Sequence, residues 1–227
     1  MAHALLAALQ LADSFFPSGM YTQSHGLESF VAAGAVGAAR IEPLLQAYIL
    51  HAAGPADALA ARWTARAAAS HDLELVAAVD ARLDAARLAA EGRLASRRCG
   101  GRVLLLGGQL FDDERLRAYA RLVAGGQAPG HQAVALALVG AAAGLDEEAA
   151  TLVELHTFAV SLVSAAVRLG ALDHADAQAL LLRAQPAMAA AAAEHAGLDW
   201  RDIGGFAPQI DVMQFRHRWA ETHMFVS

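Results

Sequence analysis

Large apolar residues recur at the three- and four-residue spacing of an α-helix along almost the whole chain. Leu5, Leu6 and Leu9 show this spacing at the start, and residues 152–169 and 177–193 show it again further on. Glycines that would end helices interrupt the pattern at residues 34–37, 54, 125–130, 144, 170 and 197, with Pro55 directly after Gly54. The pattern predicts an all-α fold, a single-domain helical bundle of roughly eight to ten helices.

Alanine is abundant and favours the same fold. The chain has 58 alanines among its 227 residues, and alanine combines a small side chain with the highest helix propensity. We therefore expect helices packed at short distances. No repeat or flexible linker divides the chain, so we expect one domain: residues 1–206 form the helical body, and residues 207–227 form a C-terminal helix and a partner-docking tail of the same domain.

One short run has the composition of a strand. Val103–Leu106 is apolar and lies between two glycine pairs, but a single run of this kind has no other strand to pair with. The surrounding residues 100–108 are rich in glycine and lack the Lys followed by Ser or Thr that a phosphate-binding loop needs. We expect these glycines to end a helix or to allow close packing.

Charge and hydropathy patterning exclude several partners. The formal net charge is -6, and all 17 basic residues are arginines scattered along the chain, so no basic patch for nucleic acid is present. The longest uncharged runs, residues 122–145 and 155–167, are interrupted or too short to cross a membrane. A single cysteine and no signal-peptide pattern at the start indicate the cytoplasm.

No group of residues typical of catalysis or cofactor binding stands out. Cys99 follows two arginines, which would favour a thiolate, but a lone cysteine is more often a packed residue. We therefore expect no catalytic residue, no cofactor and no enzymatic activity.

Ten histidines raise the question of a metal site. His217 and His223, near the C-terminus, are separated in a way that places them on different faces of a helix, or about 20 Å apart along a strand. Ligands of one ion lie within about 4 Å of each other. We expect no metal site made by this chain alone; a transient site shared between subunits stays open.

The segment over residues 9–31 differs from an ordinary helix. A helix that begins near Thr22 would carry apolar side chains on one face, namely Leu27, Phe30 and Val31. The opposite face would carry polar ones, namely Ser24, His25 and Glu28. Both core packing and a partner-binding surface remain open for this segment.

The C-terminal segment, residues 208–227, is unusually apolar for a chain end. It carries Met213, Phe215, Trp219, Met224 and Phe225. A tail of this composition must dock, either onto its own domain or onto another chain with ordering on binding.

Three motifs occur in order along the chain. The first is a leucine-rich start over residues 9–11, a turn with Pro17 and Gly19, and then Ser24, Gly26, Leu27 and Glu28. The second is Gly130–Ala133, followed by residues 165–168 and 176–178, and the third is His217, Phe225 and Ser227. Together they resemble the urease accessory protein UreF family, from about residue 5 to the last residue. Gln23, Glu221 and His223 stand where many members have Tyr, Tyr and Arg.

The resemblance implies an all-helical protein, usually a homodimer, with no chemistry of its own. Family members bridge a second accessory protein, UreD (also called UreH), to the GTPase UreG, and this assembly delivers nickel to apo-urease. The alternative hypothesis is activation of GTP hydrolysis by UreG through an arginine such as Arg168, and the sequence does not choose between the two.

On the basis of this resemblance, we assign partner-binding residues as a hypothesis. The surface that would recognise UreG includes Ser24, His25, Glu28 and Arg168. The tail that would order against UreD includes His217, Trp219, His223, Met224, Phe225 and Ser227. Within it, Trp219, Met224 and Phe225 would be the apolar anchors.

Overall fold

The computed structural model describes residues 2–219 and 223–226, and Ser227 therefore lies outside the described part. The α-helices are α1 (Ala2–Ala12), α2 (Leu27–Ala32), α3 (Ala38–Tyr48), α4 (Leu59–Ala69), α5 (Leu73–Ala86), α6 (Ala90–Leu110), α7 (Glu114–Ala124), α8 (Gln132–Ala142), α9 (Glu147–Arg168), α10 (His174–Glu194) and α11 (Pro208–His217). A π-helical segment (Ile49–Ala58) joins α3 to α4, and 3₁₀ turns lie at Met20–Thr22, His195–Gly197 and Trp200–Asp202. Since α3 and α4 form one continuous run, the described residues contain ten separate α-helices and no strand, which confirms the predicted all-α bundle.

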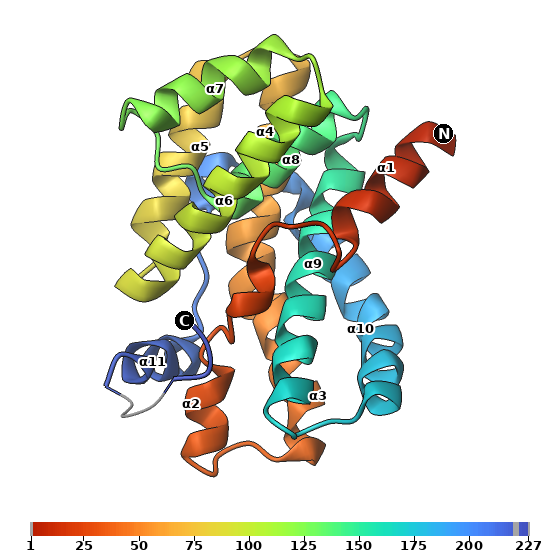
Figure 1. Ribbon diagram of the computed structural model, residues 1–227, viewed down its shortest axis with the longest axis vertical. Helices are drawn as coiled ribbons and strands as arrows, with labels where there is room; N and C mark the ends of the chain where they lie inside the picture. Colours follow the sequence, from red (N-terminus) through yellow and green to blue (C-terminus); the bar gives the residue numbers. More distant parts are fainter. Residues whose placement is uncertain (1, 220–222, 227) are drawn as a thin grey trace.

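The long helix α9 runs through the middle of the bundle (Figure 1). Helices α4, α8 and α10 and the π segment pack against it. One buried cluster lies mainly among α4–α8, and a second lies mainly among α2, α3, the π segment, α9 and α10. Helix α9 joins the two clusters, because Val153 belongs to the first and Leu155 and Leu162 belong to the second.

By length and composition, α9 is the one helix among the described residues that could cross a membrane. However, 67% of its most apolar window is buried inside the protein. The core helix of a soluble protein has the same composition, because it is covered by other helices on most sides.

The glycine-rich residues 100–108 lie inside α6, so the expectation that they end a helix is wrong and the expectation of close packing is confirmed. A Cβ atom at Gly100 would overlap the backbone carbonyl of Gly130, and one at Gly107 would overlap the side chain of Val139. These two glycines let α6 lie directly against α8 and the turn before it. The strand-like run Val103–Leu106 is part of the same helix.

The expected break at Gly54 and Pro55 is also wrong, because the chain continues through it as the π segment. Proline has no N–H to donate and its ring clashes with the preceding turn of an α-helix. The wider π turn accommodates Pro55, and the carbonyls of His51 and Pro55 instead accept the N–H groups of Phe206 and Gly204, each at 3.0 Å.

The predicted helix start near Thr22 is wrong as well. Residues Met20–Thr22 make a single 3₁₀ turn, and α2 begins only at Leu27. Gly26 adopts a left-handed φ of 84°, which separates the two elements. The apolar side of the segment is confirmed, since Leu27 and Phe30 are buried.

Candidate functional site

The C-terminal tail folds back onto its own domain. Helix α11 packs against α2 and α6 (Figure 1), and residues 223–226 then return alongside the start of α2. The N–H of Val226 donates to the carbonyl of Thr22 at 2.8 Å. Of the two docking alternatives, the described tail residues show docking onto the chain's own domain.

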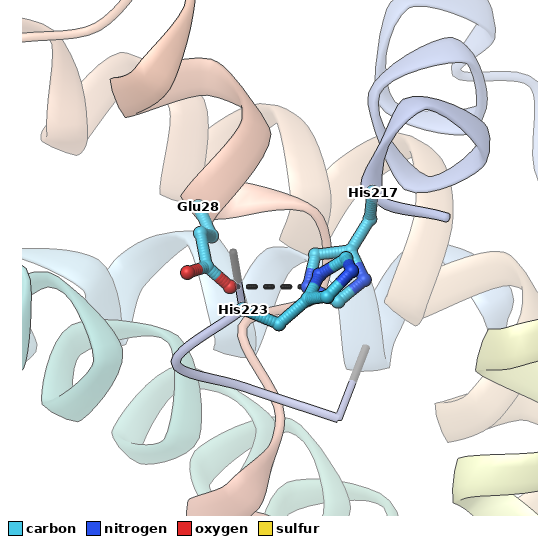
Figure 2. Close-up of side chains that lie close together, drawn as sticks. All are labelled: Glu28, His217 and His223. Carbon is cyan, nitrogen blue, oxygen red and sulfur yellow. Dashed lines mark hydrogen bonds and ion pairs between the residues drawn. The ribbon is translucent and has the colours of Figure 1, made fainter. Parts of the chain in front are cut away.

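Glu28 fastens this tail. It lies in the first turn of α2, where the helix dipole favours a carboxylate. Its Oε1 accepts the N–H of Met224 at 2.8 Å, and its Oε2 accepts the N–H of Phe225 at 3.3 Å. Oε2 also lies 3.0 Å from Nε2 of His217. The carboxylate of Glu28 therefore connects α2, α11 and the tail (Figure 2).

His217, the last residue of α11, is only 2% exposed and lies between two carboxylates. Its Nε2 faces Glu28, and its Nδ1 lies 3.1 Å from Oε2 of Glu91 on α6. Its ring centroid is 4.6 Å from that of His223. The expectation that spacing would keep the two histidines apart is wrong, because α11 ends at His217 and neither helical nor strand spacing applies up to His223.

Phe225 is the buried anchor of the tail, with 4% of its surface exposed. It joins the cluster formed mainly by α2, α3, α9 and α10. The guanidinium of Arg168, at the end of α9, lies 4.2 Å from the centre of its ring. Burial lowers the pKa of Arg168, an effect that the nearby Tyr21 partly opposes. The structure thus brings together Arg168 and Phe225, which sequence analysis had assigned to different partner surfaces.

Two other predicted tail residues point outward. Trp219 is 78% exposed and Met224 is 61% exposed. Along the chain they lie between the buried His217 and Phe225, so the docked tail leaves apolar surface accessible.

The expected polar face at residues 24–28 is wrong for two of its three members. Ser24 is completely buried, and His25 is half-buried with its ring 4.7 Å from that of Phe158. Nε2 of His25 lies 3.1 Å from Oγ of Ser161, which itself donates to the carbonyl of Met20. Burial lowers the pKa of His25 to about 3, so the neutral ring donates from Nε2. Core packing explains these two residues.

Cys99 is buried, as expected of a packed cysteine. Its sulfur accepts a hydrogen bond from the amide of Gln23 at 2.9 Å. Burial raises the pKa of the thiol, which is the opposite of what a reactive cysteine needs.

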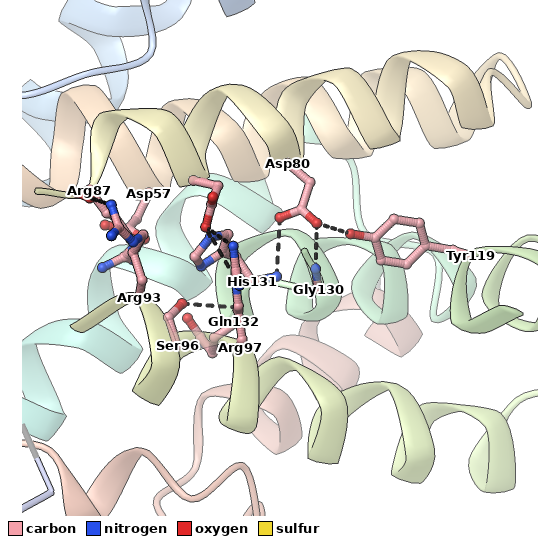
Figure 3. Close-up of polar contacts among 11 residues, drawn as sticks. Asp57, Asp80, Arg87, Arg93, Ser96, Arg97, Tyr119, Gly130, His131 and Gln132 are labelled. Atoms are coloured by element: carbon pink, nitrogen blue, oxygen red, sulfur yellow. Dashed lines mark hydrogen bonds and ion pairs between the residues drawn. The ribbon is translucent and has the colours of Figure 1, made fainter. Parts of the chain in front are cut away.

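Sequence analysis missed a buried polar network around the Gly130–Ala133 motif. The carboxylate of Asp80 on α5 accepts the hydroxyl of Tyr119 and the N–H of Gly130, both at 2.6 Å, and the N–H of His131 at 3.1 Å (Figure 3). Nε2 of His131 lies 2.9 Å from Oδ1 of Asp84. Burial lowers the pKa of His131 to about 3 and raises that of Asp80. The motif therefore holds α5, α7 and α8 together, but no sequence signal connects it to Asp80.

A polar cavity of about 100 Å³ lies beside this network. Its lining includes His25, Tyr48, Asp57, Arg87 and Glu154. Oε2 of Glu154 is buried without a hydrogen-bond partner in the described part of the chain. A space of this size and polarity holds a few water molecules, each occupying about 30 Å³.

Comparison with known proteins places this all-helical chain among the urease accessory proteins. Relatives that carry the name urease accessory protein UreF are found in Paenarthrobacter aurescens (35% identical over 223 residues, 98% of this chain and 97% of that protein), Trichodesmium erythraeum (32% over 213 residues, 93% and 92%) and Lachnoclostridium phytofermentans (32% over 224 residues, 98% of each). The UreF family model matches residues 35–185. The chain belongs to the UreF family, as its motifs indicated.

Proposed function

We propose that this protein is a cytoplasmic scaffold in urease maturation, which bridges UreD (UreH) to the GTPase UreG and promotes nickel insertion into apo-urease. It acts by binding other proteins at its surface, and it makes or breaks no covalent bond itself. The observation that carries the proposal is the tail. It presents Trp219 and Met224 to solvent while Phe225 is docked, in a chain that is similar over nearly its whole length to urease accessory proteins.

The tail is suited to bind UreD because its attachment to the body is limited. One buried aromatic ring and the hydrogen bonds to Glu28 and Thr22 fasten residues 224–226. A partner that supplies a deeper pocket for aromatic and apolar anchors would compete with these contacts, since such anchors dominate interface energies. Residues 207–227 thus act as the docking segment of the domain.

A second apolar surface lies on α1, which projects from the body (Figure 1). Leu5, Leu6 and Leu9 share one face of this helix and are all exposed, and Phe15 beyond it is exposed too. Grouped apolar side chains on a surface indicate contact with another protein. We assign this face to the interface of a homodimer.

The bridging role is tested by capture of UreD, UreG and urease from cells that co-express them with the tagged protein. The variants Trp219→Asp and Met224→Asp place a charge in the proposed interface without touching the core. Leu182→Asp on α10 is the matched control, because Leu182 is 65% exposed and lies on another element. We expect the two tail variants to lose UreD and urease activation, and the control to retain both.

Equal capture of UreD by all three variants would contradict the assignment of the tail as the UreD-binding segment.

A GTPase assay of UreG with the assembled complex tests the alternative function, which is activation of GTP hydrolysis. Arg168 is the candidate arginine, and its guanidinium packs over Phe225 in the docked state. No stimulation at saturating complex leaves the scaffold role alone.

A further inference from the structure

Three side chains from separate parts of the chain meet at the base of the tail. They are Glu28 on α2, His217 at the end of α11 and His223 in the tail (Figure 2). One oxygen and two ring nitrogens, one atom from each residue, all lie within 4.8 Å of one another. This arrangement places two imidazoles and a carboxylate around one point.

The donor set is that of a transition-metal site. Imidazole nitrogen is a preferred ligand of Ni²⁺, Zn²⁺ and Cu²⁺, whereas Mg²⁺ and Ca²⁺ favour oxygen alone. Ligand atoms of one such ion lie about 3–4 Å apart, since each bond is about 2.0–2.2 Å long. Oε2 of Glu28 and Nε2 of His217 already meet this condition at 3.0 Å. His223 is exposed and lies on the tail, so a small movement of its ring completes the set.

An independent contact orients the central ligand. Nδ1 of His217 lies 3.1 Å from Oε2 of Glu91, and this contact fixes the ring so that Nε2 is directed at Glu28. Histidines that bind metal almost always donate their second ring N–H to a carboxylate, a carbonyl or water. The buried His217 therefore lies between two carboxylates with different parts in a metal site: Glu28 would be a second ligand, and Glu91 would orient the ring.

We propose that Glu28, His217 and His223 bind one divalent transition-metal ion per chain, with Glu91 as the positioning residue. Three protein ligands leave at least one coordination position for water. The bound ion would tie the tail to α2 and α11. This binding is a property of the single chain and needs none of the partners invoked above.

The test is calorimetric titration of the tag-free full-length protein with NiCl₂ and, separately, with ZnSO₄. We expect one ion per chain and a loss of affinity of about tenfold or more in His223→Ala. His174→Ala is the matched control, because His174 is an exposed histidine at the start of α10. We expect this control to bind as the natural protein does.

A second variant and a second measurement distinguish the loss of a metal ligand from a loss of folding. Glu91→Gln should lower the affinity about 10–100-fold if Glu91 orients His217. The visible absorption of bound Co²⁺ should change in His223→Ala while the helical circular dichroism stays constant. Unchanged affinity in His223→Ala, or one ion for every two chains, would overturn the proposal. Failure to bind UreD or UreG would leave it intact, since the titration contains the isolated chain only.

Discussion

At the scale of single residues, Glu28 determines where the tail lies. Its carboxylate accepts two backbone N–H groups of the tail and faces His217. Sequence analysis singled out Glu28 as a polar residue for partner recognition, but its neighbours Ser24 and His25 are taken up by the core. The residue types could be predicted, whereas the direction in which each side chain points depends on the left-handed Gly26 and on contacts with α9 and α11.

We expect Glu28→Ala to release the tail. The loss of hydrogen bonds to a charged acceptor costs about 1.5–3 kcal/mol, which raises the undocked population about tenfold or more. Limited trypsin digestion followed by mass spectrometry measures this as faster cleavage after Arg218. Glu28→Gln keeps an oxygen acceptor and serves as the control. Equal cleavage rates in Glu28→Ala and the natural protein would show that other contacts hold the tail.

A second residue-scale prediction concerns Glu154. Burial and, to a smaller extent, the nearby Asp57 raise its pKa to about 8, while Arg87 opposes the shift. The folded state therefore holds a proton that the unfolded state releases, so the free energy of unfolding falls as pH rises from about 4.5 to 8. Below pH 6.5, His25 and His131 make the free energy of unfolding rise with pH, because their folded pKa values of about 3 lie below the ordinary value and the unfolded state binds the protons.

The informative range is thus pH 6.5 to 8. Urea unfolding of the natural protein should show stability falling by about 1–2 kcal/mol across it. Glu154→Gln should flatten this dependence, because the amide does not titrate. A slope that persists unchanged in Glu154→Gln would assign the effect to another group.

At the scale of elements, the π segment shows what a sequence pattern leaves out. Gly54 and Pro55 are typical signals of a helix end, and elsewhere the same reasoning is correct, since Gly144 and Gly170 follow α8 and α9 with left-handed φ values of 85° and 71°. At Pro55 the decisive factor is remote in sequence. Residues 204–206 supply the N–H groups that satisfy the carbonyls of the wide turn.

Gly205 is the residue that permits this contact. A Cβ atom there would lie 2.6 Å from the carbonyl oxygen of His51 and 3.0 Å from Cα of Ala52. We expect Gly205→Ala to lower the free energy of unfolding by about 1–3 kcal/mol, as overpacking does. Gly197→Ala is the control, because no atom lies within 4 Å of its Cβ position. Equal urea midpoints for the two variants would show that the loop shifts without cost.

At the scale of the whole molecule, the helical class follows from the period, and glycine placement predicts the ends of α2, α7, α8, α9 and α10. The position of the tail cannot be predicted in this way, because the residues that contact the tail are far from it along the chain, namely Thr22, Glu28 and Arg168. The link between Asp80 and the motif at Gly130 is hidden for the same reason. Local pattern predicts elements, and contacts between distant segments arise only when the elements pack.

The proposed homodimer gives a prediction at this scale. Leu6→Glu replaces an exposed leucine on α1 and should shift the protein toward monomer, because each buried leucine contributes about 1.5–3 kcal/mol. Light scattering after size-exclusion chromatography measures the mass. Leu182→Glu has a leucine of equal exposure on α10 and should leave the mass unchanged. An unchanged dimer in Leu6→Glu would place the interface elsewhere.

The stacking of Arg168 on Phe225 makes the surface at the end of α9 and the C-terminal tail dependent on each other. Arg168 is exposed, and withdrawing the aromatic ring from its seat also frees the face of the guanidinium that the ring covers. The hydrogen bonds to Glu28 break at the same time. Whatever captures the last residues of this protein therefore prepares a charged site for a different molecule. By thermodynamic reciprocity, occupation of that charged site makes the end of the chain easier to capture.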